Sequence, residues 1–208
     1  MTEADWLACT DPWKLCSEMG WKGSHRKFRL FGVACCRSLW HLAGDDVTRN
    51  AIEVAERYAD GEATSSEARS AGHFMEEEVP IDFMDHLSED QVNLKFAAGR
   101  VCLPYDLMDN IQGVLNNLQR RNAENARFLR DIFGNPFQWV YIERTWMAPR
   151  VLTLARAIYE ERSVDGMPIL ADALEEASCT DQEILAHCRG PGPHVRGCWV
   201  VDLLLGKT

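Results

Sequence analysis

Signals that begin a helix recur from one end of the sequence to the other, and most are followed by a residue that can end one. Thr64 precedes Glu67 by three residues, and Ser88 precedes Gln91 in the same way. This spacing is typical of a capping box at a helix N-terminus. Glycine or proline follows most of the apolar stretches, where either can end a helix. The pattern predicts an all-α fold, an irregular bundle of about nine helices.

The clearest helical stripe lies between Ser24, which can cap a helix, and Gly44, which can end it. Apolar side chains recur there three or four residues apart and so fall on one helix face. They are Phe28, Phe31, Cys35, Leu39 and Leu42. Near the other end of the chain, Thr180 and Glu183 have the spacing of a further capping box, which predicts a helix over 181–188.

Two stretches bear on how the chain is divided. Apolar residues recur with helical spacing from Leu107 to Ile132, which predicts a long helical stretch ending at Gly134. Residues 137–146 are aromatic and β-branched but have no partner strand, so we expect an extended connection there. Because no flexible linker or internal repeat is visible, residues 1–208 are expected to form a single domain. It would have a small C-terminal helical lobe and any seam near 134–148.

Composition limits where the protein can work. Hydrophobic residues make up 46% of the 208 and charged residues 26%. No apolar run reaches the roughly 18 residues that a transmembrane helix needs. The acidic start is unlike a signal peptide, so we expect a cytoplasmic protein whose eight cysteines are thiols. The net charge of −10 makes nucleic acid an unlikely partner, since its phosphates attract basic proteins.

The charge is unevenly distributed along the chain. Residues 53–90 hold twelve acidic residues against two arginines, a net charge of −10, whereas residues 14–52 have a net charge of +4. The two segments can lie against each other or face solvent, or they can form a surface steered by charge towards a protein partner. The candidate partner-binding residues are Lys22, Arg26, Lys27, Arg29, Glu76, Glu77 and Glu78.

Soft metal ligands are concentrated near the C-terminus, where three cysteines and two histidines occur within twenty residues, His187 among them. Zinc prefers four such ligands in a tetrahedron. The simplest set leaves gaps of eight, five and three residues, unlike the short knuckle of most zinc motifs. The alternative is that the thiols pack between short helices. The candidate zinc ligands are Cys179, Cys188, His194 and Cys198.

The same segment also suggests an anion site. Residues 187–197 hold two histidines and two arginines without an acidic residue, and glycine amides precede an expected helix over 198–205. Such amides favour phosphate or carboxylate. The alternative is a rigid turn whose glycines and prolines serve backbone geometry alone. The candidate anion-binding residues are Arg189, Gly190, Gly192, His194 and Arg196.

Enzyme signatures such as a phosphate-binding loop, a dinucleotide fingerprint or a zinc-protease motif are absent from the sequence. Cys188 or Cys198 with a nearby histidine could form a nucleophile and its base, but such pairs arise by chance in a chain rich in both. We therefore expect a non-enzymatic helical module that binds a protein partner through its charge-polarised N-terminal half. The alternative is a protein that binds zinc or an anion at the C-terminal segment.

Four segments resemble a large family of planctomycete (Gemmata-like) bacterial proteins. They are MTEADWLACTDP at 1–12, RKFRLFGVACCRSLWHL at 26–42, LRDIFGNPF at 129–137 and ILAHCRGPGPHVRGCWVVDLLLGK at 184–207. Residues 62–105 match least. The resemblance implies a bacterial, intracellular protein. It carries no known activity and therefore assigns no site residue, substrate or cofactor.

Overall fold

A computed structural model describes residues 1–19, 24–77, 86–162 and 164–207. This part of the chain is all-α, as predicted, with twelve α-helices and no strand. None of its helices is both long and apolar enough to cross a lipid bilayer. The helices are α1 (Glu3–Ala8), α2 (Pro12–Glu18), α3 (His25–Arg37), α4 (Asp46–Ala59), α5 (Ser65–Glu77), α7 (Glu89–Cys102), α8 (Leu107–Asn117), α9 (Asn122–Phe133), α10 (Pro149–Glu161), α11 (Met167–Glu176), α12 (Gln182–Arg189) and α13 (Trp199–Leu205).

The predicted capping boxes are present at two helix starts. The Thr64 amide donates to Glu67 Oε2 at 2.7 Å, and the Glu67 amide donates to Thr64 Oγ1 at 3.2 Å. Ser88 and Gln91 make the same reciprocal pair at the start of α7. Each box satisfies two amides that the first helical turn leaves without backbone partners. Local sequence therefore fixes where α5 and α7 begin.

The predicted count of about nine helices is too low, partly because the stretch 107–132 is two helices. The first, α8, ends at Asn117 with Leu118 as its C-cap, and a 3-10 turn (Gln119–Arg121) precedes α9. At the break the Leu118 carbonyl accepts from the Arg121 amide at 3.0 Å and from the Asn125 side-chain amide at 3.3 Å. Leu118 itself is buried. The apolar spacing continues through the break because α8 and α9 both bury their apolar faces in the same core cluster.

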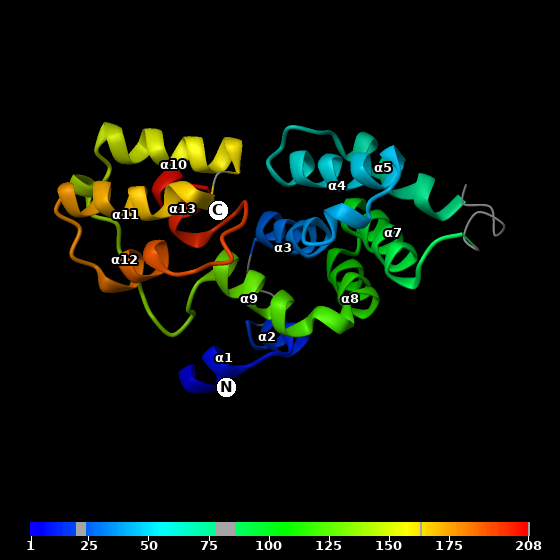
Figure 1. Ribbon diagram of the computed structural model, residues 1–208, viewed down its shortest axis with the longest axis horizontal. Helices are drawn as coiled ribbons and strands as arrows, with labels where there is room; N and C mark the ends of the chain where they lie inside the picture. Colours follow the sequence, from blue (N-terminus) through cyan, green and yellow to red (C-terminus); the bar gives the residue numbers. More distant parts are fainter. Residues whose placement is uncertain (20–23, 78–85, 163, 208) are drawn as a thin grey trace.

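Buried side chains form two clusters. The N-terminal bundle, α1 to α9, encloses one around α3, which contacts α4, α7, α8 and α9. The C-terminal lobe, α10 to α13, encloses the other. In Figure 1 the lobe lies on one side of the molecule and α3 to α8 on the other, with α9 between them. The connection predicted to be extended over 137–146 leads from one cluster to the other. Residues 137–143 contain no helix, but Arg144–Trp146 form a 3-10 helix.

Buried ion pairs join the bundle to the lobe. Asp60, which follows α4, has no exposed side-chain surface and accepts hydrogen bonds from Arg26 of α3, from Arg196 and from the Tyr159 hydroxyl. Arg26 also donates to Asp202 of α13 at 2.6 Å. Burial tends to raise the pKa of Asp60, but these donors outweigh it and hold the pKa below its usual range. The lobe is therefore fastened by charges that solvent screens little.

Candidate metal centre

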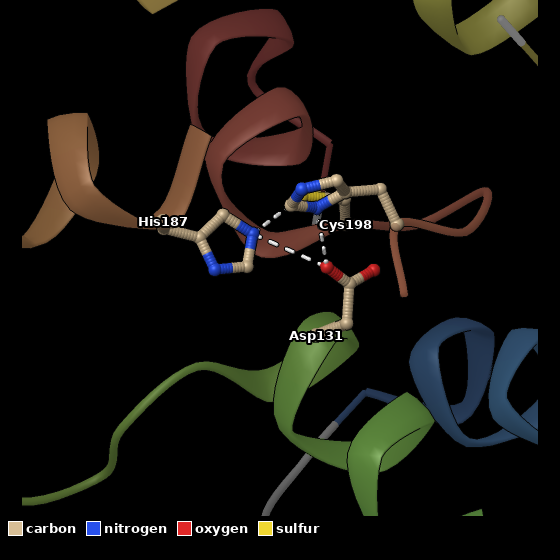
Figure 2. A group of neighbouring side chains, drawn as sticks. Asp131, His187 and Cys198 are labelled. Carbon is tan, nitrogen blue, oxygen red and sulfur yellow. Dashed lines mark hydrogen bonds and ion pairs between the residues drawn. The ribbon is translucent and has the colours of Figure 1, made fainter. Parts of the chain in front are cut away.

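Four metal-ligating side chains converge where α9 meets the lobe. Asp131 lies near the C-terminal end of α9, His187 on α12, His194 in the loop that follows α12, and Cys198 directly before α13. Their ligand atoms all lie within 4.8 Å of one another. Figure 2 shows Asp131, His187 and Cys198 pointing towards one another from three separate elements. Segments distant in the sequence thus build a compact group, which we call the Asp-His-His-Cys cluster.

Asp131 Oδ1 and His187 Nε2 each take part in two of the close contacts within the cluster. Asp131 Oδ1 lies 3.2 Å from His187 Nε2 and 3.1 Å from His194 Nδ1. His187 Nε2 also lies 3.1 Å from Cys198 Sγ. Asp131 and Cys198 are buried, and the His187 and His194 side chains are 20% and 8% exposed. The donor atoms therefore face one point, largely shielded from solvent.

Neighbouring backbone groups orient two of the four side chains. The Val195 amide donates to Asp131 Oδ2 at 2.9 Å, which leaves Oδ1 facing the cluster. His194 Nε2 lies 3.3 Å from the Gly190 carbonyl, where it can only donate, so Nδ1 is the acceptor in the neutral ring and donates to Asp131 only when the ring is charged. Such hydrogen bonds from outside the ligand set are the usual means of orienting metal ligands.

The cluster also shifts the protonation of its members. Burial tends to raise the pKa of Asp131, but hydrogen bonds from His187 and His194 outweigh it and lower that pKa. Burial tends to lower the pKa of His194, and the hydrogen bond to Asp131 reverses this and raises it. For Cys198, burial and the Asp131 charge both raise the pKa, well above its usual value. Without a metal ion, Cys198 is therefore a neutral thiol and a poor nucleophile.

The donor set and its spacing fit zinc. Bonds of about 2.0–2.1 Å to nitrogen or oxygen and about 2.3 Å to sulfur place tetrahedral ligand atoms roughly 3.3–3.6 Å apart. The three closest separations in the cluster are 3.1–3.2 Å. The widest is at most 4.8 Å, a difference that rotation of a side chain can remove. One carboxylate, two imidazoles and one thiol are all ligands that zinc accepts.

The zinc set predicted from the sequence shares His194 and Cys198 with the cluster, whereas Cys179 and Cys188 lie outside it. Cys188 follows His187 by one residue on α12 and therefore faces a different direction. It packs in the core of the lobe, as does Cys179, and burial raises its pKa to about 12. Cys179 and Cys188 thus match the alternative interpretation, in which thiols pack between helices, and all eight cysteines are free thiols.

Sequence reasoning missed half of the cluster. Asp131 belongs to a helix of the N-terminal bundle, and no spacing rule connects it to a segment more than fifty residues later. His187 is one of the soft ligands near the C-terminus, but the set chosen from the sequence has Cys179 and Cys188 in place of Asp131 and His187. The predicted helix could have pointed to His187, because adjacent residues of a helix face different directions, so His187 and Cys188 cannot both face one metal ion.

The predicted anion-binding residues take separate partners. Arg189 is paired with Asp172 and Glu175 on α11, and Arg196 with Asp60. The backbone carbonyls of the loop are also engaged: Gly190 O with His194, and Gly192 O with Arg127, which donates to it at 2.6 Å. The two arginines that would supply positive charge are therefore neutralised by carboxylates of other elements. Within the turn, the Gly190 carbonyl lies 3.3 Å from His194 Nε2.

The predicted partner-binding residues on α3 are turned inwards. Arg26 belongs to the ion pairs around Asp60, and Arg29, which is 4% exposed, donates to the Val101 and Leu103 carbonyls. Lys27 donates to the Ile132 carbonyl at 3.0 Å. Glu76 and Glu77 lie on α5, while Lys22 and Glu78 fall outside the described residues. The basic side chains of α3 thus bind their own chain.

Comparisons of the sequence with protein-family models and with curated proteins, and of the structure with solved structures, found no match. The resemblance to planctomycete proteins stays a prediction from the sequence segments alone.

Proposed function

We propose that this is a metal-binding protein that holds one zinc ion through Asp131, His187, His194 and Cys198. The observation that carries the proposal is the convergence of four donor atoms within 4.8 Å from three separate parts of the fold. Hydrogen bonds outside the set orient Asp131 and His194, as expected of residues arranged for a metal.

Charge supports a divalent ion. The Asp131 carboxylate and a Cys198 thiolate together carry two negative charges, and the two imidazoles are neutral when they bind a metal. A zinc ion therefore makes the buried group electrically neutral, which removes most of the cost of burying its charges. It also displaces the proton that burial keeps on Cys198.

Four protein ligands fill a tetrahedral zinc ion, so the proposed role is structural rather than catalytic. Asp131 comes from the N-terminal bundle and the other three ligands from the C-terminal lobe. A bound ion would thus fasten the lobe to the bundle, next to the ion pairs around Asp60.

The test is the metal content of protein purified without added zinc. We expect about one zinc per chain in the natural protein and a loss of that zinc in Cys198→Ser, because a serine hydroxyl is a poor zinc ligand. Cys179→Ser is the matched control, since Cys179 is also buried but lies outside the cluster. Equal zinc content in the two variants, or no zinc in the natural protein, would overturn the proposal.

A second candidate function is the binding of a protein partner, and a specific observation favours it. The connection between the two clusters carries Trp139 and Tyr141, which are 84% and 76% exposed. Exposed aromatic side chains are enriched at binding surfaces. The partner surface we propose is therefore this connection rather than the basic face of α3.

Co-purification at low and high salt tests this second function. An aromatic contact should persist at high salt, because apolar burial is not screened, and should be lost in a Trp139→Ala, Tyr141→Ala double variant. A partner that is released by salt and retained by the double variant would point back to charge steering. Absence of a partner at either salt concentration would remove the basis for both interpretations.

A further inference from the structure

A cavity of about 650 Å³ lies between the N-terminal bundle and the C-terminal lobe. Its walls come from α3, α4 and α9 on one side and from α10, α11 and the loop 190–196 on the other. The walls are largely apolar, with Leu30, Val33, Phe128, Ile158 and Met167 among them. Cavities of this size at such junctions commonly hold small organic molecules.

Charged groups interrupt the apolar lining. Three guanidinium groups, Arg37, Arg162 and Arg196, and two carboxylates, Glu56 and Asp165, line the cavity. Arg196 is paired with Asp60, whereas Arg37 and Arg162 share Glu56. Glu56 is buried and accepts hydrogen bonds from both Arg37 (2.7 Å) and Arg162 Nε (3.3 Å). One carboxylate thus serves two guanidinium groups, each of which has more donors than Glu56 can accept.

Arg162 is the guanidinium best placed to reach a ligand. It follows α10 directly and its side chain is 46% exposed, whereas the side chain of Glu56 beside it is 2% exposed. Arg37 is held more firmly, because its guanidinium also stacks 4.6 Å from the centre of the Trp40 ring. A negatively charged group entering the cavity would therefore meet Arg162 first, with Arg37 behind the shared carboxylate.

We propose that this cavity binds a small organic anion that has an apolar body and one negatively charged group, such as a carboxylate. The body lies along the apolar walls, and the anionic group accepts hydrogen bonds from Arg162, supported by the positive charge of Arg37. An amine in the same place would lie beside two guanidinium groups that share a single carboxylate. The site requires no metal ion, although the loop 190–196 and Cys198 form part of its wall.

The first experiment uses the natural protein and 8-anilinonaphthalene-1-sulfonate, a probe with an aromatic body and one anionic group that fluoresces in apolar surroundings. Octanoate, octanol and octylammonium share one chain length and differ in the charge of the head group. We expect octanoate to displace the probe at a concentration about tenfold lower than octylammonium, with octanol between them. Displacement by all three at the same concentration, or no binding of the probe, would overturn the proposal.

A second experiment assigns the anionic group to Arg162. Arg162→Gln should weaken octanoate binding about tenfold and leave octanol binding unchanged, because one charge-assisted hydrogen bond is lost. Arg162→Lys should retain most of the affinity. Arg156→Gln is the control: it removes the same charge from an exposed position of α10 that does not line the cavity. Near-ultraviolet circular dichroism confirms that each variant is folded.

An equal loss in Arg156→Gln and Arg162→Gln would show that only the overall charge matters, and would contradict the assignment. Both experiments are run on zinc-saturated and on chelator-treated protein. Octanoate binding in both preparations would support the anion site even if the protein binds no zinc. Zinc binding without octanoate binding would overturn the anion site and leave the zinc site standing.

Discussion

Protons bound to His194 and Cys198 compete with a metal ion for these two ligands. The raised pKa of His194 keeps this side chain protonated to higher pH than an ordinary histidine, and the raised pKa of Cys198 keeps its thiol neutral across the physiological range. Zinc must displace both protons, because it binds only neutral imidazole and thiolate. The lowered pKa of Asp131 means that this ligand needs no such displacement at neutral pH.

Zinc affinity should therefore rise with pH. Below about pH 6.5 the metal displaces a proton from His194 and another from Cys198, and above the raised pKa of His194 it displaces only the thiol proton. In the metal-free protein the sign is opposite: a raised histidine pKa stabilises the fold below about pH 6.5, and this contribution is lost as pH rises through the folded value. Calorimetric titration in buffers of different ionisation enthalpy measures the protons released. No proton release on zinc binding at pH 6 would contradict this account.

The sequence can predict which cluster residues lie together only where these residues are close along the chain. His194 and Cys198 are four residues apart, so their proximity was visible in the sequence. Asp131 approaches them only because α9 packs beside the lobe, and that packing depends on every side chain between them. The burial that removes Cys179 and Cys188 from the site is likewise a property of the folded core.

Helix starts are the elements that sequence predicts best, because a cap acts within four residues. The exception is α12, where the predicted box of Thr180 and Glu183 is replaced by Asp181, whose carboxylate accepts from the Glu183 and Ile184 amides at 2.9 and 3.1 Å. Aspartate is as good a cap as serine or threonine, so two adjacent candidates could not be ranked by spacing alone. The break at Leu118 was missed because apolar spacing carries no signal where two successive helices bury the same side.

Removal of the cap tests this correction. Asp181→Ala should lower the free energy of unfolding by about 1 kcal/mol, because two amides of the first turn lose their acceptor. Thr180→Ala, one residue earlier and exposed, should change it by less than about 0.5 kcal/mol. Denaturant unfolding of the two variants gives the answer, and a larger loss in Thr180→Ala would restore the cap predicted from the sequence.

At the scale of the whole molecule, the basic and acidic segments of the chain meet partly inside it. The all-α class, the C-terminal lobe and the extended connection follow from local patterns, whereas the pairing of Arg26 with Asp202 and of Asp60 with Arg196 needs the two halves docked. An interior pair of charges looks the same in a sequence as a solvated one. The sequence therefore predicts a partner surface on α3, although its basic side chains bind their own chain.

Asp60→Asn tests the junction. The variant leaves Arg26 and Arg196 short of a buried counter-charge, so the free energy of unfolding should fall by about 3–5 kcal/mol at neutral pH. Because the pKa of Asp60 is lowered in the folded protein, the difference from the natural protein should be complete above about pH 4 and shrink as pH falls further. Asp90→Asn, in an exposed pair with Arg120, should cost less than about 1 kcal/mol. Equal effects of the two substitutions would mean that the buried pairs do not hold the lobe.

A zinc titration against a chromophoric chelator tests most directly whether a metal ion joins the bundle to the lobe. The natural protein should compete for one zinc per chain, and Asp131→Asn should weaken that binding by about tenfold or more, since even residues behind the ligands matter that much. Cys179→Ser should bind as the natural protein does. A protein that does not compete, or one in which Asp131→Asn binds normally while Cys179→Ser fails, would contradict the account.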